Sequence, residues 1–371
     1  MNDSFSAFEI QRTNWKGSIP VALSLASTSN ASSATPPTLH QMVPRNSYLH
    51  LGLKESVSQL YQHAPVLIGF PSVTQNDEDE GDQGTEQDGN REQTDVADGE
   101  NTNTATETKR DNDERTARNE KDTHDENSDV TYPICWFEDQ ESGTPLRWQL
   151  FAGVLFDLLS STQQSDSTCL PWKIIVHFTS YPATLLPLNN DPIPSIASTS
   201  SSSKTEHNSC VMEHLSHQYS NSLKQALFLQ HDSNRISKDM SKSSHLMIWD
   251  SIVRNQFELY KNVTISCHFE GKAQDEIKHI PVRVMVDGRP AFVKPCFPFR
   301  QTQCESDDKV KVTLEQFLLE WLSHLFESTQ PKCKVLIQGI KVPLESTVLD
   351  LWRTLSHPDR FLYILVISNR I

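Results

Sequence analysis

The chain has 371 residues and a formal net charge of −15, which argues against the basic surface of a nucleic-acid-binding protein. The negative charge is concentrated in residues 76–130, which hold 20 of the 48 acidic residues and 6 of the 33 basic ones. This segment has no aromatic residue and few aliphatic ones, so it cannot bury enough apolar surface to offset the entropy of ordering. We expect a disordered insert in a surface loop, with an acidic interaction tail as the alternative.

The seven cysteines are dispersed. None stands in a CxxC pair, so the spacing of a zinc site is absent, and we expect neither a metal ion nor a cofactor. An odd, dispersed set is typical of reduced thiols in the cytosol. The N-terminus lacks the apolar core of a signal peptide, and the densest apolar run, residues 361–367, is too short to span a bilayer. We therefore expect a soluble, cytoplasmic protein.

The elements expected before the insert are short. Residues 1–14 predict an N-terminal helical segment, and residues 19–26 predict a strand. Residues 48–53 show an alternation of side chains that predicts a second strand. Apolar residues at helical spacing then predict a helix over residues 53–63.

Regular structure is expected again after the insert. Residues 143–148 predict a turn that leads into a strand, and residues 152–160 predict a buried helix. Residues 170–178 predict a strand with Ile174 and Val176 on one face.

The middle of the chain is helical. A serine-rich linker, residues 181–206, separates it from the first part of the chain, and helices are expected at 211–229 and 243–261. The apolar stripe of the first helix consists of Met212, Leu215, Tyr219, Leu223 and Ala226. That of the second region consists of Trp249, Ile252, Val253, Phe257 and Tyr260. We assign residues 207–265 to a helix-rich domain.

The last third has a different rhythm. Residues 280–286 and 291–295 predict a hairpin around an Asp-Gly turn. Thr313 and Gln316 have the spacing of a capping box at the start of a helix. The buried face of this helix is expected to contain Leu314, Phe317, Leu318, Trp321, Leu322 and Leu325. The later elements are a strand at 334–337, a short helix at 347–355 and a strand at 361–367.

Hairpin, helix, strand, short helix and strand is the element order of a ubiquitin-like β-grasp domain. We assign residues 278–371 to such a domain, and residues 15–180 fit the same order once the insert is removed. The expected fold class is therefore α+β, with two ubiquitin-like β-grasp domains flanking a helix-rich domain and with disordered inserts.

No enzyme signature is found: the chain has no glycine-rich phosphate loop, no GxSxG elbow and no HExxH motif. We interpret His177 as a strand-surface histidine rather than a metal ligand. Cys296 is the best candidate nucleophile by sequence, but a small residue at a strand end is the favoured interpretation. Asp157 lies in an otherwise apolar helix. It fits either a contact with the backbone or with a partner group, or the exposed face of an amphipathic helix, and we favour the exposed face.

Several segments, in order along the chain, resemble the autophagy protein 5 family. They are WKGSIPVALSL from residue 15, VPRNSYLHL from 43, WFEDQESGTPLRWQLFAGVLFDLLSS from 136, LPWKIIVHF from 170, NSLKQA from 221, IPVRV from 280, RPAFVKPCFP from 289 and QGIKVPLESTVLDLWRTLSHPDRFLYILV from 338. The matches skip the acidic insert and the serine-rich stretch. No single segment is decisive, but the ordered set is specific.

The resemblance implies a particular partner chemistry. A lysine of the helical domain would form an isopeptide bond with the C-terminal glycine of the ubiquitin-like autophagy protein 12, through activating and conjugating enzymes related to those of ubiquitin. The conjugate would bind autophagy protein 16 and act as an E3-like factor. Together with the conjugating enzyme of autophagy protein 8, it would promote transfer of that protein to phosphatidylethanolamine. The chain would sit peripherally on the preautophagosomal or isolation membrane and would hold no catalytic residue.

Lys224 is the acceptor that the resemblance implies, because the family motif is similar to NSLKEA and this chain has NSLKQA. Gln225 replaces the acidic residue, and we hypothesise that the loss of a negative neighbour favours the neutral amine, the form that attacks a thioester. At about 100° per residue, Lys224 lies about 140° from the centre of the apolar stripe and should point to solvent. Lys204, Lys238 and Lys242 are rivals, in linker-like surroundings without the motif.

Two other functions remain open. The first is a ubiquitin-like adaptor that binds partners but is never conjugated, which the substitution Lys224→Arg would distinguish. The second is a hydrolase or transferase with an unrecognised site, which would require a clustered Cys–His pair or a metal site in the fold.

Overall fold

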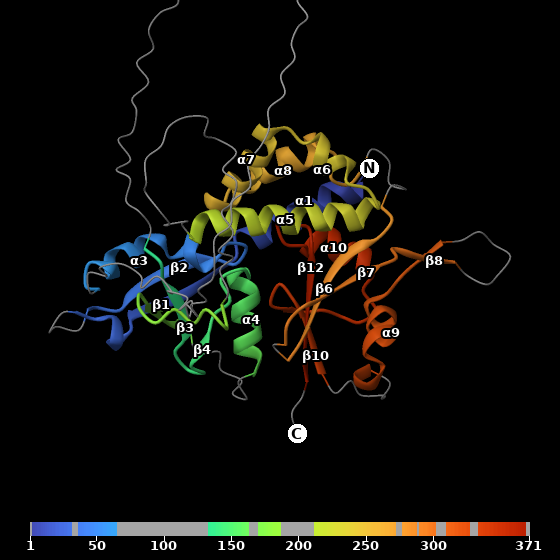
Figure 1. Ribbon diagram of the computed structural model, residues 1–371. Helices are drawn as coiled ribbons and strands as arrows, with labels where there is room; N and C mark the ends of the chain where they lie inside the picture. Colours follow the sequence, from blue (N-terminus) through green and yellow to red (C-terminus); the bar gives the residue numbers. More distant parts are fainter. Residues whose placement is uncertain are drawn as a thin grey trace, which may run out of the picture. The chain divides into compact units, whose positions relative to one another are not determined.

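The computed structural model describes residues 2–31, 36–64, 133–162, 170–186, 211–271, 277–287, 289–301, 309–326 and 333–368 (Figure 1). The expected acidic insert at 76–130 and most of the serine-rich linker at 181–206 lie outside these residues.

The first sheet is formed by strands from both sides of the insert. They are β1 (Ser18–Leu25), β2 (Leu39–Pro44), β3 (Trp136–Asp139), β4 (Thr144–Pro145) and β5 (Trp172–His177). Their order is β2-β1-β5-β3-β4, with β1 and β5 parallel and the other neighbours antiparallel. The helices of this part are η1 (Ser27–Ser29), α2 (Leu49–Gly52), α3 (Lys54–Tyr61) and α4 (Ala152–Thr162). In β5, Ile174 and Val176 are buried and Lys173 is exposed, as the alternation predicts.

The second sheet repeats this arrangement. Its strands are β6 (Ile280–Val286), β7 (Phe292–Cys296), β10 (Cys333–Ile337), β11 (Ile340–Lys341) and β12 (Leu362–Ser368). The order is β11-β10-β12-β6-β7, with β6 and β12 parallel in the centre. Read from the hairpin, this is the strand order of the first sheet, so both sheets have the β-grasp topology. The remaining elements are α9 (Leu314–Phe326), α10 (Val348–Leu355) and a ribbon of β8 (Phe299–Gln301) and β9 (Lys309–Lys311).

The capping box at the start of α9 is present in both directions. Thr313 N–H donates to Gln316 Oε1 at 3.2 Å, and Gln316 N–H donates to Thr313 Oγ1 at 3.3 Å. These two bonds satisfy donors at the helix start that have no partner within the helix, which explains why α9 begins where the sequence predicts.

The helical region comprises α5 to α8 (Figure 1). Their bounds are α5 (Val211–His231), α6 (Arg235–Asp239), α7 (Lys242–Val253) and α8 (Phe257–Ser266). The N-terminal α1 (Asn2–Trp15) packs on this region, because the Trp15 ring lies 5.6 Å from Phe257 and 4.8 Å from Tyr260. Gln11 of α1 also donates a hydrogen bond to the backbone of α10.

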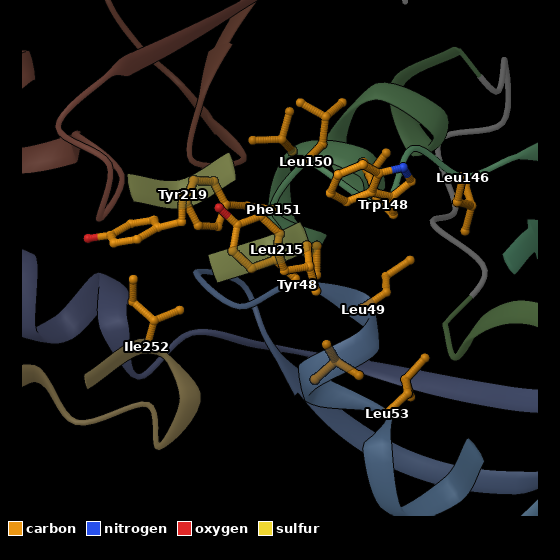
Figure 2. Packing of buried hydrophobic residues seen from close by; sticks show 14 of the residues in the cluster. Tyr48, Leu49, Leu53, Leu146, Trp148, Leu150, Phe151, Leu215, Tyr219 and Ile252 are labelled. Atoms are coloured by element: carbon orange, nitrogen blue, oxygen red, sulfur yellow. The ribbon is translucent and has the colours of Figure 1, made fainter. Parts of the chain in front are cut away.

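One buried apolar cluster is shared by the first sheet, the helical region and β12. Tyr48 stacks on Phe151 at 4.7 Å, and Tyr219 of α5 lies 5.7 Å from Trp249. Figure 2 shows Tyr48 and Phe151 next to Leu215 of α5. The predicted stripe of α5 is buried here, except that Met212 is only half-buried. Because α5 contributes to this core along its length, its inner face is fixed.

The strand expected at residues 48–53 is wrong, since this segment forms the helix α2. Leu49 and Leu53, four residues apart, are both buried, which is helical spacing rather than the alternation of a strand. The strand that pairs with β1 is instead β2, and the helix packs closely on it. A Cβ at Gly52 would lie 2.7 Å from the Val43 side chain, so glycine permits this approach.

Two further expectations about helices are corrected. The helix expected over 243–261 is two helices, α7 and α8, separated at Asn255, which has a positive φ of 52°. Val253 is consequently 45% exposed. Trp321 was expected in the buried face of α9 but is 43% exposed, with Lys294 Nζ 3.5 Å from the ring centre. α9 is non-helical at Leu322 (φ −130°, ψ 39°), which interrupts the regular stripe at this point.

Candidate conjugation site

The motif NSLKQA occupies residues 221–226, in the second half of α5. Lys224 is exposed, as its helical position predicts, whereas Leu223 and Ala226 are buried. The helix therefore presents the amine to solvent while the neighbouring side chains hold its inner face in the core.

Two neighbours of Lys224 are bonded to the second β-grasp domain. Ser222 Oγ donates to Asp359 Oδ2 at 2.7 Å. Arg283 Nη2 donates to Gln225 Oε1 at 3.4 Å. These contacts could not be predicted from the sequence, because Asp359 lies 137 residues from Ser222 and Arg283 lies 58 residues from Gln225 along the chain. Only the family resemblance drew attention to the segment HPDRFLYI, which contains Asp359, and it did not predict the bond to Ser222.

Asp359 and Arg283 belong to a polar cluster enclosed by apolar side chains. The Asp359 side chain is 1% exposed, and Arg283 Nη1 lies 3.2 Å from its Oδ2. Tyr363 OH also donates to Asp359 Oδ2, at 2.9 Å, and the Arg283 guanidinium lies 3.9 Å from the centre of the Phe361 ring. Burial, and then the charge of Asp359, raise the pKa of Tyr363, so its hydroxyl keeps its proton and remains a donor.

A histidine of α7 lies within electrostatic range of Lys224. Burial, and then the positive charge of Lys224, lower the pKa of His245. Its imidazole is therefore neutral at neutral pH. Phe228, one turn after Lys224, is 50% exposed, and Leu246 is 67% exposed. Exposed apolar side chains thus accompany the exposed amine on this part of the helical region.

The rival lysines differ in position from what the sequence predicts. Lys238 lies in α6 and Lys242 is the first residue of α7, so neither stands in a linker. Both are exposed. Lys204 lies outside the described residues. Exposure alone does not separate Lys224 from Lys238 and Lys242; the surrounding motif does.

The exposed position favoured for Asp157 is wrong. Asp157 is 4% exposed, and its carboxylate forms an ion pair with Arg45. Burial raises the pKa of Asp157, and the charge of Arg45 and the backbone of Gly339 oppose that rise. The contact alternative is correct, and the pair holds the chain between β2 and α2 against α4.

The other two candidates, His177 and Cys296, make packing contacts within the fold. The His177 ring stacks on Trp136 at 3.8 Å, and its Nε2 lies 3.4 Å from Glu138 Oε2. Cys296 is buried, and burial raises the pKa of its thiol to about 12, so the thiolate needed for nucleophilic attack is scarce.

Cys267 and His268 line one cavity of about 500 Å³ beside α6 and α7. The His268 Nδ1 lies 3.0 Å from the Ser266 backbone oxygen. The Cys267 Sγ lies 3.9 Å from Ser266 Oγ. Within the described ranges, no three His, Cys, Asp or Glu side chains are grouped so that they could hold a metal ion.

None of the helices in the described part of the chain has both the length and the apolar run that crossing a membrane requires.

Three family models match successive parts of the chain. Their descriptions are "Autophagy protein ATG5, UblA domain" for residues 14–78 and 116–178, "Autophagy protein ATG5, alpha-helical bundle region" for residues 212–266, and "Autophagy protein ATG5, UblB domain" for residues 279–366. The matches follow the order of the first sheet, the helical region and the second sheet.

Individual relatives agree with these matches. Autophagy protein 5 of Scheffersomyces stipitis is 26% identical over 243 residues, which covers 63% of this chain and 76% of the relative. Autophagy protein 5 of Debaryomyces hansenii is 25% identical over 252 residues, covering 66% and 78%.

A solved structure shows the same fold. The crystal structure of Kluyveromyces marxianus Atg5 superposes with a TM-score of 0.59 at 18% identity, covering 96% of this chain and 98% of that one. Two ubiquitin-like domains thus flank a helical bundle here, and the chain belongs to the autophagy protein 5 family.

Proposed function

We propose that this autophagy protein is a non-catalytic scaffold that receives the ubiquitin-like autophagy protein 12 on Lys224. The observation that carries the proposal is the position of Lys224. It is exposed on α5, within the acceptor-like motif NSLKQA, while the residues beside it are buried or bonded. A primary amine held on a rigid helix suits attack on a thioester carried by a separate enzyme.

The conjugate would act through its partners. Joined to autophagy protein 12 and bound to autophagy protein 16, it would work as an E3-like factor. It would position the conjugating enzyme of autophagy protein 8 so that this protein is transferred to phosphatidylethanolamine. The conjugate would act while bound peripherally to the preautophagosomal or isolation membrane. Fixing the geometry of a charged enzyme requires no catalytic side chain from the scaffold.

The test is the substitution Lys224→Arg in the full-length chain, incubated with autophagy protein 12, its activating and conjugating enzymes and ATP. Arginine keeps the charge but cannot form the isopeptide bond under these conditions, so we expect the higher-mass conjugate to disappear. Lys242→Arg is the matched control, since Lys242 is also an exposed lysine of the helical region, and it should conjugate like the wild type.

The alternative function is a ubiquitin-like adaptor that binds partners without being conjugated. It predicts that Lys224→Arg leaves autophagy unchanged in cells and that the wild-type chain gives no conjugate. A conjugate that persists in Lys224→Arg would instead place the acceptor on another lysine.

A further inference from the structure

We propose that Asp359 and Arg283, both in the second ubiquitin-like domain, are positioning residues for the acceptor lysine. Through Ser222 and Gln225 they fix the rotation of α5 and thereby the place at which Lys224 meets the thioester. The inference rests on the proposed role of Lys224 and adds that acceptor competence depends on a domain other than the one that carries the lysine.

The contacts lie on both sides of Lys224. Two residues before it, Ser222 Oγ donates to Asp359 Oδ2 at 2.7 Å. One residue after it, Gln225 Oε1 accepts from Arg283 Nη2 at 3.4 Å. Arg283 and Asp359 are joined to each other at 3.2 Å, so both bonds end on one ion pair. Rolling α5 about its axis would strain both contacts at once.

The anchor cannot easily follow such a movement. Asp359 Oδ1 accepts the backbone N–H of Phe361 at 3.2 Å, and Oδ2 accepts from Tyr363 OH at 2.9 Å. One turn before Ser222, Tyr219 OH donates to the Pro358 backbone oxygen at 3.1 Å. Displacing Asp359 would leave a carboxylate that is 1% exposed without its donors, which is costly in a buried setting.

The chemistry explains why rotation matters. The neutral Nζ of Lys224 attacks the thioester carbonyl carbon. The C–N bond forms, the C–S bond breaks, the electron pair leaves on the cysteine sulfur of the conjugating enzyme, and the amine proton passes to solvent. With a helix radius of about 2.3 Å and an extended lysine, a roll of about 20° would move Nζ by roughly 3 Å. Such a displacement takes the amine out of line with the thioester carbon and lowers the rate.

Ser222→Ala is the decisive variant, and Ser251→Ala is its matched control. Both serines are buried in helices of the same region, but Ser251 Oγ donates to the Ile248 backbone oxygen at 2.6 Å, inside α7. Each change removes one buried hydrogen bond, although the bond of Ser222 to a carboxylate is the stronger of the two. Of the two changes, only Ser222→Ala removes a bond between α5 and the second ubiquitin-like domain.

The measurement is single-turnover transfer of the ubiquitin-like modifier from its charged conjugating enzyme to the full-length chain, at increasing chain concentration. We expect Ser222→Ala to lower the maximal rate about fivefold to tenfold, with less than about a twofold change in the half-saturating concentration. Ser251→Ala should match the wild type in both quantities, although it also lowers the unfolding midpoint.

Asp359→Asn extends the test, because asparagine keeps the shape and removes the charge. Rates are compared relative to the wild type. If Ser222 acts through Asp359, the relative rate of the double variant Ser222→Ala/Asp359→Asn will exceed the product of the relative rates of the two single variants. Equal maximal rates for Ser222→Ala and Ser251→Ala would overturn the inference. Lys224→Arg, run in the same assay, separates the two claims. A conjugate that persists there overturns the acceptor role and the inference with it, whereas loss of the conjugate with an unaffected Ser222→Ala overturns the inference alone.

Discussion

At the scale of single residues, Asp157 shows what a buried charge requires. Its carboxylate pairs with Arg45, and the two side chains are 6% and 16% exposed. The sequence marks Asp157 as unusual, because it is a charge in an apolar helix. It does not reveal the partner, which lies 112 residues away. Without that contact, an exposed helix face and a buried ion pair could not be separated.

Removing Arg45 should therefore cost more than removing an arginine from an exposed pair. We expect Arg45→Ala to lower the free energy of unfolding by about 3–5 kcal/mol, because it leaves the Asp157 charge buried alone. Arg254→Ala is the control: Arg254 bonds to Asp250 at 2.8 Å, but the side chains are 63% and 39% exposed, and the loss should stay below about 1 kcal/mol. Urea denaturation measures both, and equal losses would contradict the burial argument.

The surroundings of the proposed acceptor, Lys224, were likewise predicted only in part. Helical spacing predicted that Lys224 faces solvent, and the structure confirms this exposure. The bonds of Ser222 and Gln225 were beyond prediction, because their partners come from distant strands and turns that only the tertiary fold brings to α5.

At the scale of elements, a helix or strand is predicted correctly when the residues that determine it are neighbours in the sequence. The start of α9 is an example, since Thr313 and Gln316 cap each other. The segment 48–53 is the opposite case. Six residues are too few to separate strand from helix by periodicity, and its packing against β2 decides the outcome.

The capping box supplies a prediction for this scale. Thr313→Ala should lower the free energy of unfolding by about 1 kcal/mol, because donors at the start of α9 lose their acceptor. Thr354→Ala is a suitable comparison, since the Thr354 hydroxyl bonds to the Asp350 backbone oxygen inside α10 at 2.8 Å and caps nothing. Urea midpoints that move equally for the two variants would show that the cap itself adds no stability.

At the scale of the whole molecule, the two ubiquitin-like domains meet in buried polar contacts. Gln338 Nε2 donates to Asn46 Oδ1 at 3.1 Å, and neighbouring Gly339 has a φ of +75° close to the Arg45–Asp157 pair. The composition and element order predicted two β-grasp domains and a helical region. The side chains that join them could not be predicted, because the hydrophobic periodicity of each domain indicates which residues are buried in that domain and not which polar residues meet between domains.

Buried histidines should make the stability of this assembly depend on pH. Burial lowers the pKa of His50 to about 4 and, together with the charges of Arg45 and Arg283, that of His357 to about 3. In the unfolded chain both histidines have a pKa of about 6.5. The unfolded state therefore binds more protons below about pH 6.5, so the free energy of unfolding falls as the pH drops from about 6.5 towards 4.

His357→Phe tests this account. Neither ring nitrogen of His357 has a hydrogen-bond partner among the described residues, and the ring packs on Phe151 at 5.1 Å and Tyr363 at 4.7 Å. We expect the variant to reduce the pH slope of the free energy of unfolding by about 1 kcal/mol per pH unit between about pH 4 and 6. Urea denaturation at a series of pH values gives this slope, and an unchanged slope would show that His357 is not held neutral by the fold.

The central claim is that Lys224 carries an isopeptide bond, and mass spectrometry of the chain isolated from its own cells tests it most directly. After proteolysis, the account predicts a branched peptide in which the C-terminal residues of a ubiquitin-like protein are attached to Lys224 Nζ, and this peptide should be absent from cells that express Lys224→Arg. A branch on Lys238, Lys242 or another lysine, with Lys224 unmodified, would contradict it.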